Sequence, residues 1–110
     1  MSISQTQVTI ANGTSLSPEV DIGNKLLVGI AMPALWTAAA LTFQASFDGG
    51  VTWLNMQSAS AELNYTAAQG QYICVDPSLW RGVVALKVRS GSAGTPVNQG
   101  QNSTLTLITV

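Results

Sequence analysis

Histidine is absent from the 110 residues of this chain, and charged side chains are scarce. Only 8 % of the residues are Asp, Glu, Lys or Arg, against about 25 % in an average soluble protein. Without histidine, the sequence lacks the commonest general base, the commonest metal ligand and the usual pH switch near neutrality. With a net charge of −1, it also lacks the basic surface that binds nucleic-acid phosphates. We therefore expect no nucleic-acid partner.

Carboxylates are the remaining route to catalysis, because a pair of them can cleave a glycosidic bond. The five acidic residues are scattered, and no spacing brings Asp48 to Asp76 or Glu19 to Glu62. Asp76 precedes Pro77 and is better explained as a turn former. No run of residues resembles a metal-ligand set. We therefore predict that the protein is not an enzyme and that it has no catalytic, cofactor-binding or metal-binding residues.

Cys74 is the only cysteine, so no disulfide can form within the chain. It lies in the apolar run 72–75, and we expect it to be a small buried side chain. The N-terminal residues show no basic segment followed by an apolar stretch, so we expect no signal peptide. The longest apolar stretch, 26–36, is far shorter than the roughly 20 residues of a membrane span. It also contains Pro33, and we expect no membrane partner.

Valine, isoleucine and threonine are abundant, and short apolar-polar alternations recur between Gly, Asn, Asp and Ser residues. We therefore predict one all-β domain over residues 1–110, an antiparallel β-sandwich or jelly roll of about eight or nine strands. The expected strands are 7–10, 19–22, 25–32, 41–47, 51–55, 62–65, 71–75, 84–89 and 104–110. Residues 76–80 favour a turn or one short helical turn, and residues 90–103 favour a long exposed loop.

The most distinctive local pattern is S-x-D-x-G-x-T-W, formed by Ser46, Asp48, Gly50, Thr52 and Trp53. This pattern resembles the Asp box of sialidases and other β-propeller proteins. In that family the motif is a hairpin turn: the Asp accepts hydrogen bonds from turn amides, a Gly has a positive φ, and the Trp packs beneath the turn. One copy on so short a chain leaves no room for a propeller. The resemblance therefore implies a stabilising turn rather than a sugar-processing site.

The three tryptophans could form a platform on which sugars stack, as in carbohydrate-binding modules. Trp53 belongs to the hairpin turn, so Trp36 and Trp80 are the candidate residues for glycan stacking. The alternative, which we favour, is that both pack as lids over the ends of the sandwich.

The expected strand 25–32 has no polar face, so it is buried on both sides, either within the monomer or against a neighbouring subunit. Leu27 and Ala31 lie on its second face, and Ile108 and Val110 lie on the second face of the last strand. These four residues are our candidate interface. Burial inside the monomer, through a β-bulge or an end effect, is the alternative for each of them.

Five stretches of the chain carry a wider resemblance. They are VTIANG at 8–13, LVGIAMP at 27–33, LTFQAS at 41–46, LKVRSG at 86–91 and GTPVNQ at 94–99. Read in this order, they are similar to a family of small β-sandwich structural proteins in the virions of tailed phages, prophages and gene-transfer-agent-like particles.

The resemblance implies a capsid decoration, cement or head spike-base protein, assembled in the host cytoplasm and located in the virion. It implies no catalytic residue, and its expected partners are other copies of the chain and the major capsid or other virion proteins. Binding would come from many symmetric contacts. The alternative function is a carbohydrate-binding β-sandwich module, for example on a virion tail or fibre, whose partner is a surface glycan.

Overall fold

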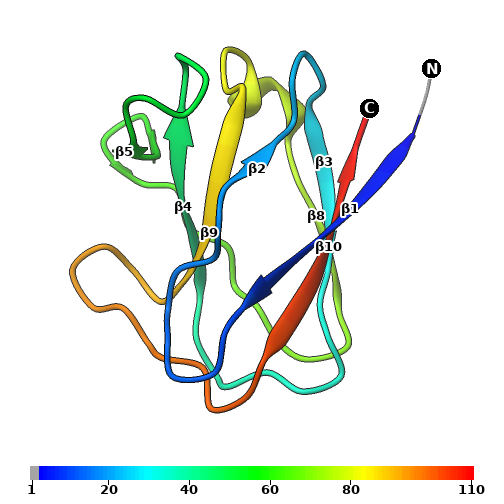
Figure 1. Cartoon of the computed structure of the whole chain (residues 1–110), viewed down its shortest axis with the longest axis vertical. Coiled ribbons are helices and arrows are strands. Elements are labelled where there is room, and N and C mark those ends of the chain that lie inside the picture. The colour runs from blue at the N-terminus through cyan, green and yellow to red at the C-terminus, as the bar shows by residue number, and fades with distance from the viewer. Residues whose placement is uncertain (1–2) are drawn as a thin grey trace.

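Two four-stranded antiparallel sheets face each other in the computed structural model, which describes residues 3–110 (Figure 1). The predicted all-β fold is confirmed. The strands are β1 (Ser4–Ile10), β2 (Val20–Asp21), β3 (Leu27–Ala31), β4 (Leu41–Ser46), β5 (Leu54–Asn55), β6 (Gln57–Ser58), β7 (Ala61–Glu62), β8 (Tyr72–Cys74), β9 (Ala85–Ser90) and β10 (Ser103–Thr109). A turn of 3-10 helix, η1 (Pro77–Trp80), forms where we predicted a turn or one short helical turn. None of the helical segments in residues 3–110 has the length and apolar character to cross a membrane.

The strand order is that of a jelly roll. One sheet has the order β1-β10-β3-β8 and the other β2-β9-β4-β5, while β6 and β7 form a separate small hairpin. With that hairpin set aside, the first strand pairs with the last, the second with the next to last, and so on inward to β4 and β5. This nested pairing is what results when one long hairpin rolls up into two sheets. Figure 1 shows the β1 sheet on the right and the β2 sheet on the left.

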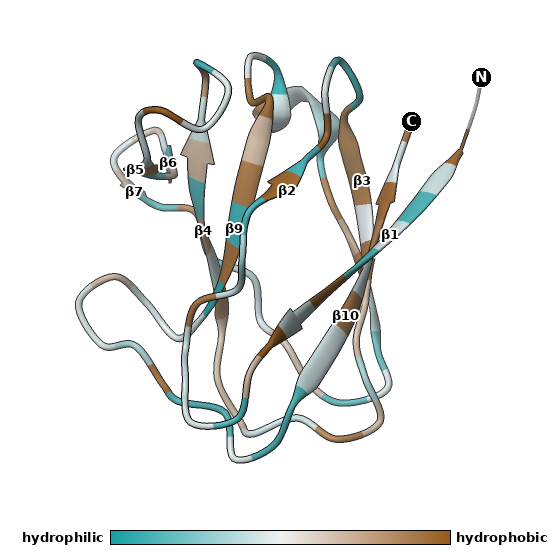
Figure 2. Ribbon diagram, viewed as in Figure 1, coloured by the Kyte–Doolittle hydropathy of each residue, from teal (hydrophilic) through white to brown (hydrophobic). Residues whose placement is uncertain are grey.

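The hydrophobic core lies between the two sheets and follows from the alternation along each strand. In β10, every second residue from Ser103 to Thr109 is buried, and the residues between them are half-buried. Figure 2 shows hydrophobic segments recurring along the paired strands. Phe43 lies at the centre of the core, with its ring centroid 5.0 Å from that of Trp80 and 5.8 Å from that of Tyr65, both edge-on. Such aromatic pairs add to the stabilisation that burial itself supplies.

Strand β3 changes face part-way along its length, because it contains a bulge. Ile108 pairs with Gly29, whereas the next residue, Thr109, pairs with Leu27, so Val28 is an extra residue. The extra residue returns Leu27 to the inner face, where its side chain is completely buried. Our assignment of Leu27 to a partner-facing surface is therefore wrong, and the bulge is the physical reason.

Cys74 also differs from the sequence prediction. Strand β8 is the edge strand of its sheet, and Cys74 is exposed rather than buried. It pairs with Gly29 on the outer side of the sheet. An apolar run on an edge strand therefore does not imply burial of all its residues.

Candidate functional site

The turn between β4 and β5 is held by the side chains that the sequence pattern singles out. The Ser46 hydroxyl donates to Asp48 Oδ1 at 2.9 Å, and the Thr52 N–H donates to the same oxygen at 2.9 Å. The Gly50 N–H donates to Ser46 Oγ at 2.8 Å, and Gly50 has a φ of 95°. The Trp53 indole N–H donates to the Gly50 carbonyl at 3.1 Å. These are the interactions that the resemblance to an Asp box implies.

This turn covers one end of a sheet face. The N–H of Thr52 is the main reason that the pKa of Asp48 lies below its ordinary value of 3.8. Lys87 Nζ lies 4.4 Å from the centre of the Trp53 ring, which is a cation–π contact. Because Lys87 pairs with Gln44 on the outer side of the β4–β9 ladder, the turn folds back over that side. We therefore assign the turn to structure.

An ion pair covers the other end of the same face. Arg89 Nη2 lies 2.7 Å from Glu62 Oε2, and the two side chains are 8 % and 22 % exposed. The guanidinium also donates to Asn55 Oδ1 at 3.0 Å and to Thr42 Oγ1 at 2.9 Å. The Glu62 carboxylate accepts the Ala93 N–H at 3.1 Å. The sequence did not reveal this network, because its members come from separate segments that only the fold brings together.

The segment 90–103, predicted to be a long exposed loop, is anchored by a buried glutamine. Gln99 is 1 % exposed. Its Oε1 accepts hydrogen bonds from the Thr37 N–H and the Ser103 hydroxyl, both at 2.9 Å. Only the tip, residues 93–96, is exposed along its whole length. The predicted long connection is therefore present, but it is exposed throughout only at its tip, and Gln99 and Ser103 are buried.

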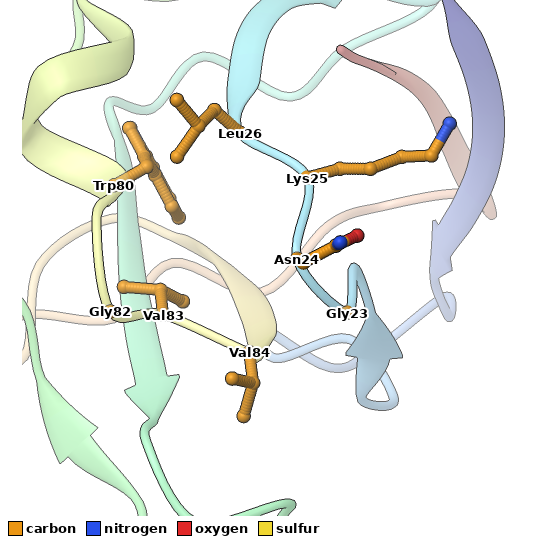
Figure 3. Close-up of a pocket in the computed structure, with 8 residues that line it drawn as sticks. All are labelled: Gly23, Asn24, Lys25, Leu26, Trp80, Gly82, Val83 and Val84. Carbon is orange, nitrogen blue, oxygen red and sulfur yellow. The ribbon is translucent and has the colours of Figure 1, made fainter. Parts of the chain in front are cut away.

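Trp36 and Trp80 do not present a stacking surface. Trp36 is 8 % exposed and donates its indole N–H to the Ala39 carbonyl at 3.1 Å. Trp80 is completely buried, and it stands beside Leu26 and Val83 in the wall of a hollow of about 220 Å³ (Figure 3). A sugar must reach the face of an aromatic ring to stack on it. Both tryptophans therefore fit the lid-packing alternative, and their assignment to glycan stacking is wrong.

Four of the five carboxylates, those of Asp21, Asp48, Asp76 and Glu62, are committed to backbone geometry or to the ion pair. Asp21 accepts the Gly23 N–H at 2.8 Å. Asp76 caps η1 by accepting the Ser78 hydroxyl and N–H at 2.8 and 3.0 Å, and these bonds lower its pKa. Within residues 3–110, no group of three or more His, Cys, Asp or Glu side chains is arranged to hold a metal ion.

The outer face of the β1-β10-β3-β8 sheet is the surface that remains uncovered. Residues that pair directly opposite each other share a face. The outward set consists of Gln5, Gln7, Thr9, Gly29, Ala31, Tyr72, Cys74, Thr104, Thr106 and Ile108. We call this set the neutral face, because none of its members carries a formal charge. All of them are exposed or half-buried except Gly29.

Tyr72 lies across the neutral face and covers Gly29. A Cβ atom on Gly29 would sit 1.9 Å from the Tyr72 hydroxyl oxygen, so the ring occupies the space that any larger side chain would fill. Tyr72 itself is 56 % exposed. Gly29 thus lets the aromatic ring lie low on the sheet, which flattens this part of the surface. A glycine within a strand pattern is the sequence signal for such close approach.

The neutral face contains two of the four candidate interface residues. Ala31 and Ile108 lie on it and are half-buried. Val110 is half-buried beyond the bulge, where its backbone pairs with that of Leu26 at 2.9 and 3.0 Å. Leu27 belongs to the core. The sequence therefore identified the middle of this face but missed Tyr72 and Cys74, which belong to the neighbouring edge strand.

Comparisons with family models, curated proteins and solved structures gave no match to the chain.

Proposed function

We propose that this chain is a non-enzymatic structural protein of a phage virion, of the capsid decoration, cement or head spike-base type. It acts through symmetric contacts with copies of itself and with the major capsid or other virion proteins.

The observation that carries the proposal is the contrast between the two sheets. The outer face of the β2 sheet is covered by the chain's own turn, ion pair and β6–β7 hairpin. The neutral face has no such cover, and its polar groups are hydroxyls and carboxamides. Placing such a surface against another protein desolvates no charge. The neutral face is therefore better suited to repeated protein contacts than to catalysis.

Two further points support the same role. The stretches 8–13, 27–33, 41–46, 86–91 and 94–99 resemble virion structural proteins, and the jelly-roll order is shared by viral capsid and lectin domains. We do not propose the glycan-binding alternative, because the two tryptophans that motivated it are buried.

The proposal is tested by mixing the purified chain with purified phage or gene-transfer-agent-like particles that were assembled without it. We expect saturable binding, measured by co-sedimentation, at a copy number that matches the symmetry of the particle. Thr106→Lys places a charge in the middle of the neutral face and should weaken this binding by at least about tenfold. Thr66→Lys, at an exposed loop position away from that face, is the matched control. A monodisperse monomer that ignores such particles would contradict the proposal.

A further inference from the structure

The edge of strand β1 differs from every other sheet edge in this fold. Each four-stranded sheet has two edge strands, which are β1 and β8 in one sheet and β2 and β5 in the other. Strands β2 and β5 have two residues each and β8 has three, whereas β1 has seven. Short edge strands are one way in which proteins prevent unwanted pairing with other chains. Three edges are therefore protected by their length, and the fourth is not.

The other protective devices are also missing from β1. Its sequence, SQTQVTI, contains no charged residue and no proline. Its pairing with β10 runs without a register shift from Ser4 to Ile10, so no bulge twists the edge away. Lysines, prolines and bulges are the features that usually blunt an exposed edge. At about 3.4 Å per residue, β1 offers an unblunted edge about 24 Å long.

The N-terminal half of β1 is also accessible from both sides. Gln5, Thr6 and Gln7 are all exposed, although successive residues point to opposite faces of a strand. Within residues 3–110, β1 forms its backbone ladder with β10 alone. Figure 1 shows this half of the strand projecting beyond the sandwich, next to the end of β10. Its free N–H and C=O groups therefore face solvent along the outer edge.

From these observations we infer that β1 pairs antiparallel with β1 of a second copy of the chain, which joins the two β1 sheets into one continuous eight-stranded sheet. A twofold axis brings together the two unprotected edges in a single step. The strand is uncharged, so no register opposes like charges. Gln and Thr side chains both donate and accept hydrogen bonds, so they can pair with whichever Gln or Thr lies opposite them across the axis.

This inference rests on the proposed structural role and names the partner in it. It also extends the neutral face, because Gln5, Gln7 and Thr9 lie on that face at the junction. In a virion, such a dimer would present the neutral faces of both copies as one surface.

The test compares the mass in solution of the full chain with that of Gln5→Lys/Gln7→Lys, measured by analytical ultracentrifugation. Lysines on β1 should halve the mass, since the lysines of one copy lie close to those of the other across the axis and repel them. Gln57→Lys/Gln69→Lys adds the same charge at two exposed positions elsewhere and should leave the mass unchanged. Mixing the double lysine variant with Gln5→Glu/Gln7→Glu should restore the larger species. Circular dichroism establishes that each variant is folded.

Hydrogen exchange of the wild-type chain gives a measurement that needs no variant. Amides in residues 4–10 should become more protected as the protein concentration rises, whereas amides of β8 and β5 should not change. A wild-type monomer, an assembly with an odd number of copies only, or an unchanged mass in the lysine variant would overturn the inference. If the wild-type chain stays monomeric yet binds particles, the edge pairing fails and the proposed function stands. If it dimerises through β1 but ignores particles, the pairing stands and the virion role fails.

Discussion

Asp48 illustrates how one ionised side chain can hold a whole turn. Its carboxylate accepts the Thr52 N–H and the Ser46 hydroxyl, and its pKa is lowered from the ordinary value of 3.8. A carboxyl group with a lower pKa in the folded state binds protons more weakly there than in the unfolded state. Its stabilisation is therefore fully present above about pH 4 and is lost as the pH falls through the lowered pKa.

Replacing Asp48 by Asn keeps an acceptor oxygen but removes the charge. We predict that Asp48→Asn lowers the melting temperature at pH 7, because charge-assisted hydrogen bonds are the stronger ones. The difference from the wild-type protein should shrink as the pH is lowered from about 4 to about 2. Thermal unfolding followed by circular dichroism across this range is the measurement. A difference that stays constant with pH would show that the charge does not stabilise the turn.

Gln99 has the same role at the opposite end of the sandwich, but it acts as a neutral amide. Its Oε1 faces donors, and its Nε2 donates to the Thr37 carbonyl at 3.0 Å and to Ser90 Oγ at 2.7 Å. Gln99→Glu keeps the shape and turns this donor into an acceptor that faces the Thr37 carbonyl. We predict a loss of about 2–3 kcal/mol in unfolding free energy at pH 7.

Part of that loss should be recovered in acid. Burial raises the pKa of a carboxyl group, so the Gln99→Glu protein gains a proton in the folded state before the unfolded state does. Its stability relative to wild type should therefore rise as the pH falls toward about 4, which urea unfolding at several pH values can follow. Gln69→Glu, at an exposed position, is the comparison. Equal losses at all pH values would contradict this reading of the amide.

The two residues also differ in how far the sequence reveals them. The turn around Asp48 is contiguous, so its residue types and spacing are sufficient to predict its hydrogen bonds. Gln99 meets Thr37 and Ser90 only after distant segments have folded together. No local sequence pattern predicts such long-range contacts, and the surrounding Gly, Ser and Asn residues suggested an exposed loop instead.

At the scale of elements, the segment after β9 begins with a turn that only glycine can make. Gly91 has a φ of 88°, and a Cβ atom there would lie 2.5 Å from the Thr95 carbonyl oxygen. Gly82 has a similar φ of 86°, but a Cβ atom there would meet no atom within 4 Å. The two glycines therefore share the backbone requirement and differ in the space around it.

We predict that Gly82→Ala lowers the unfolding free energy by about 1–2 kcal/mol, because alanine is strained in the left-handed backbone conformation. Gly91→Ala should cost at least about 1 kcal/mol more, because backbone atoms cannot move aside as a flexible side chain can. Chemical unfolding of the two variants under the same conditions provides the comparison. Equal losses of unfolding free energy would mean that the turn after β9 can move to accommodate an added methyl group at Gly91.

The ion pair of Arg89 and Glu62 joins β9 to the β6–β7 hairpin. Removing Glu62 leaves the Arg89 charge largely buried and without its partner. We therefore predict that Glu62→Ala lowers the unfolding free energy by about 2–3 kcal/mol. Combining it with Arg89→Met should cost about 1–2 kcal/mol less than the sum of the single changes. Glu62→Ala with Arg81→Met, an exposed residue, should be additive. A double-mutant cycle with no coupling would mean that the pair does not hold the hairpin in place.

The elements were predictable where their pattern was simple. Strands β4, β9 and β10 alternate cleanly, and the expected ranges differ from the observed ones by one residue at each end at most. The bulge in β3 is one of two alternatives that the sequence leaves open, because the apolar residues on both sides of it satisfy either phase of the alternation. Strand β6 was missed because two polar residues, Gln57 and Ser58, carry no apolar signal.

For the whole molecule, the fold class followed from composition and turn spacing, while the choice of jelly-roll order depends on which strands pair. The neutral face and the β1 edge depend on that choice as well, since they combine residues from both ends of the chain. Low overall charge was visible in the sequence. The sequence did not show that one entire sheet face, the neutral face, carries no charge.

Self-association through neutral surfaces should respond weakly to salt. Screening changes interactions between charges, and neither β1 nor the neutral face has any. We predict that the dissociation constant between copies changes by less than about twofold between about 0.05 M and 0.5 M NaCl. Sedimentation equilibrium at the two salt concentrations is the measurement. A marked weakening at high salt would show that charged groups elsewhere hold the copies together.

Ser4 at the start of β1 pairs with Thr109 at the end of β10, so the first and last strands meet at the corner where both reach their outer limits (Figure 1). Tension applied between these two strand ends would load one pair of backbone bonds at a time, as a zipper opens, instead of shearing the whole ladder at once. Pulling on these two strand ends would thus meet little mechanical resistance. Pulling on β4 and β9 from opposite ends of their ladder would instead require many hydrogen bonds to break together.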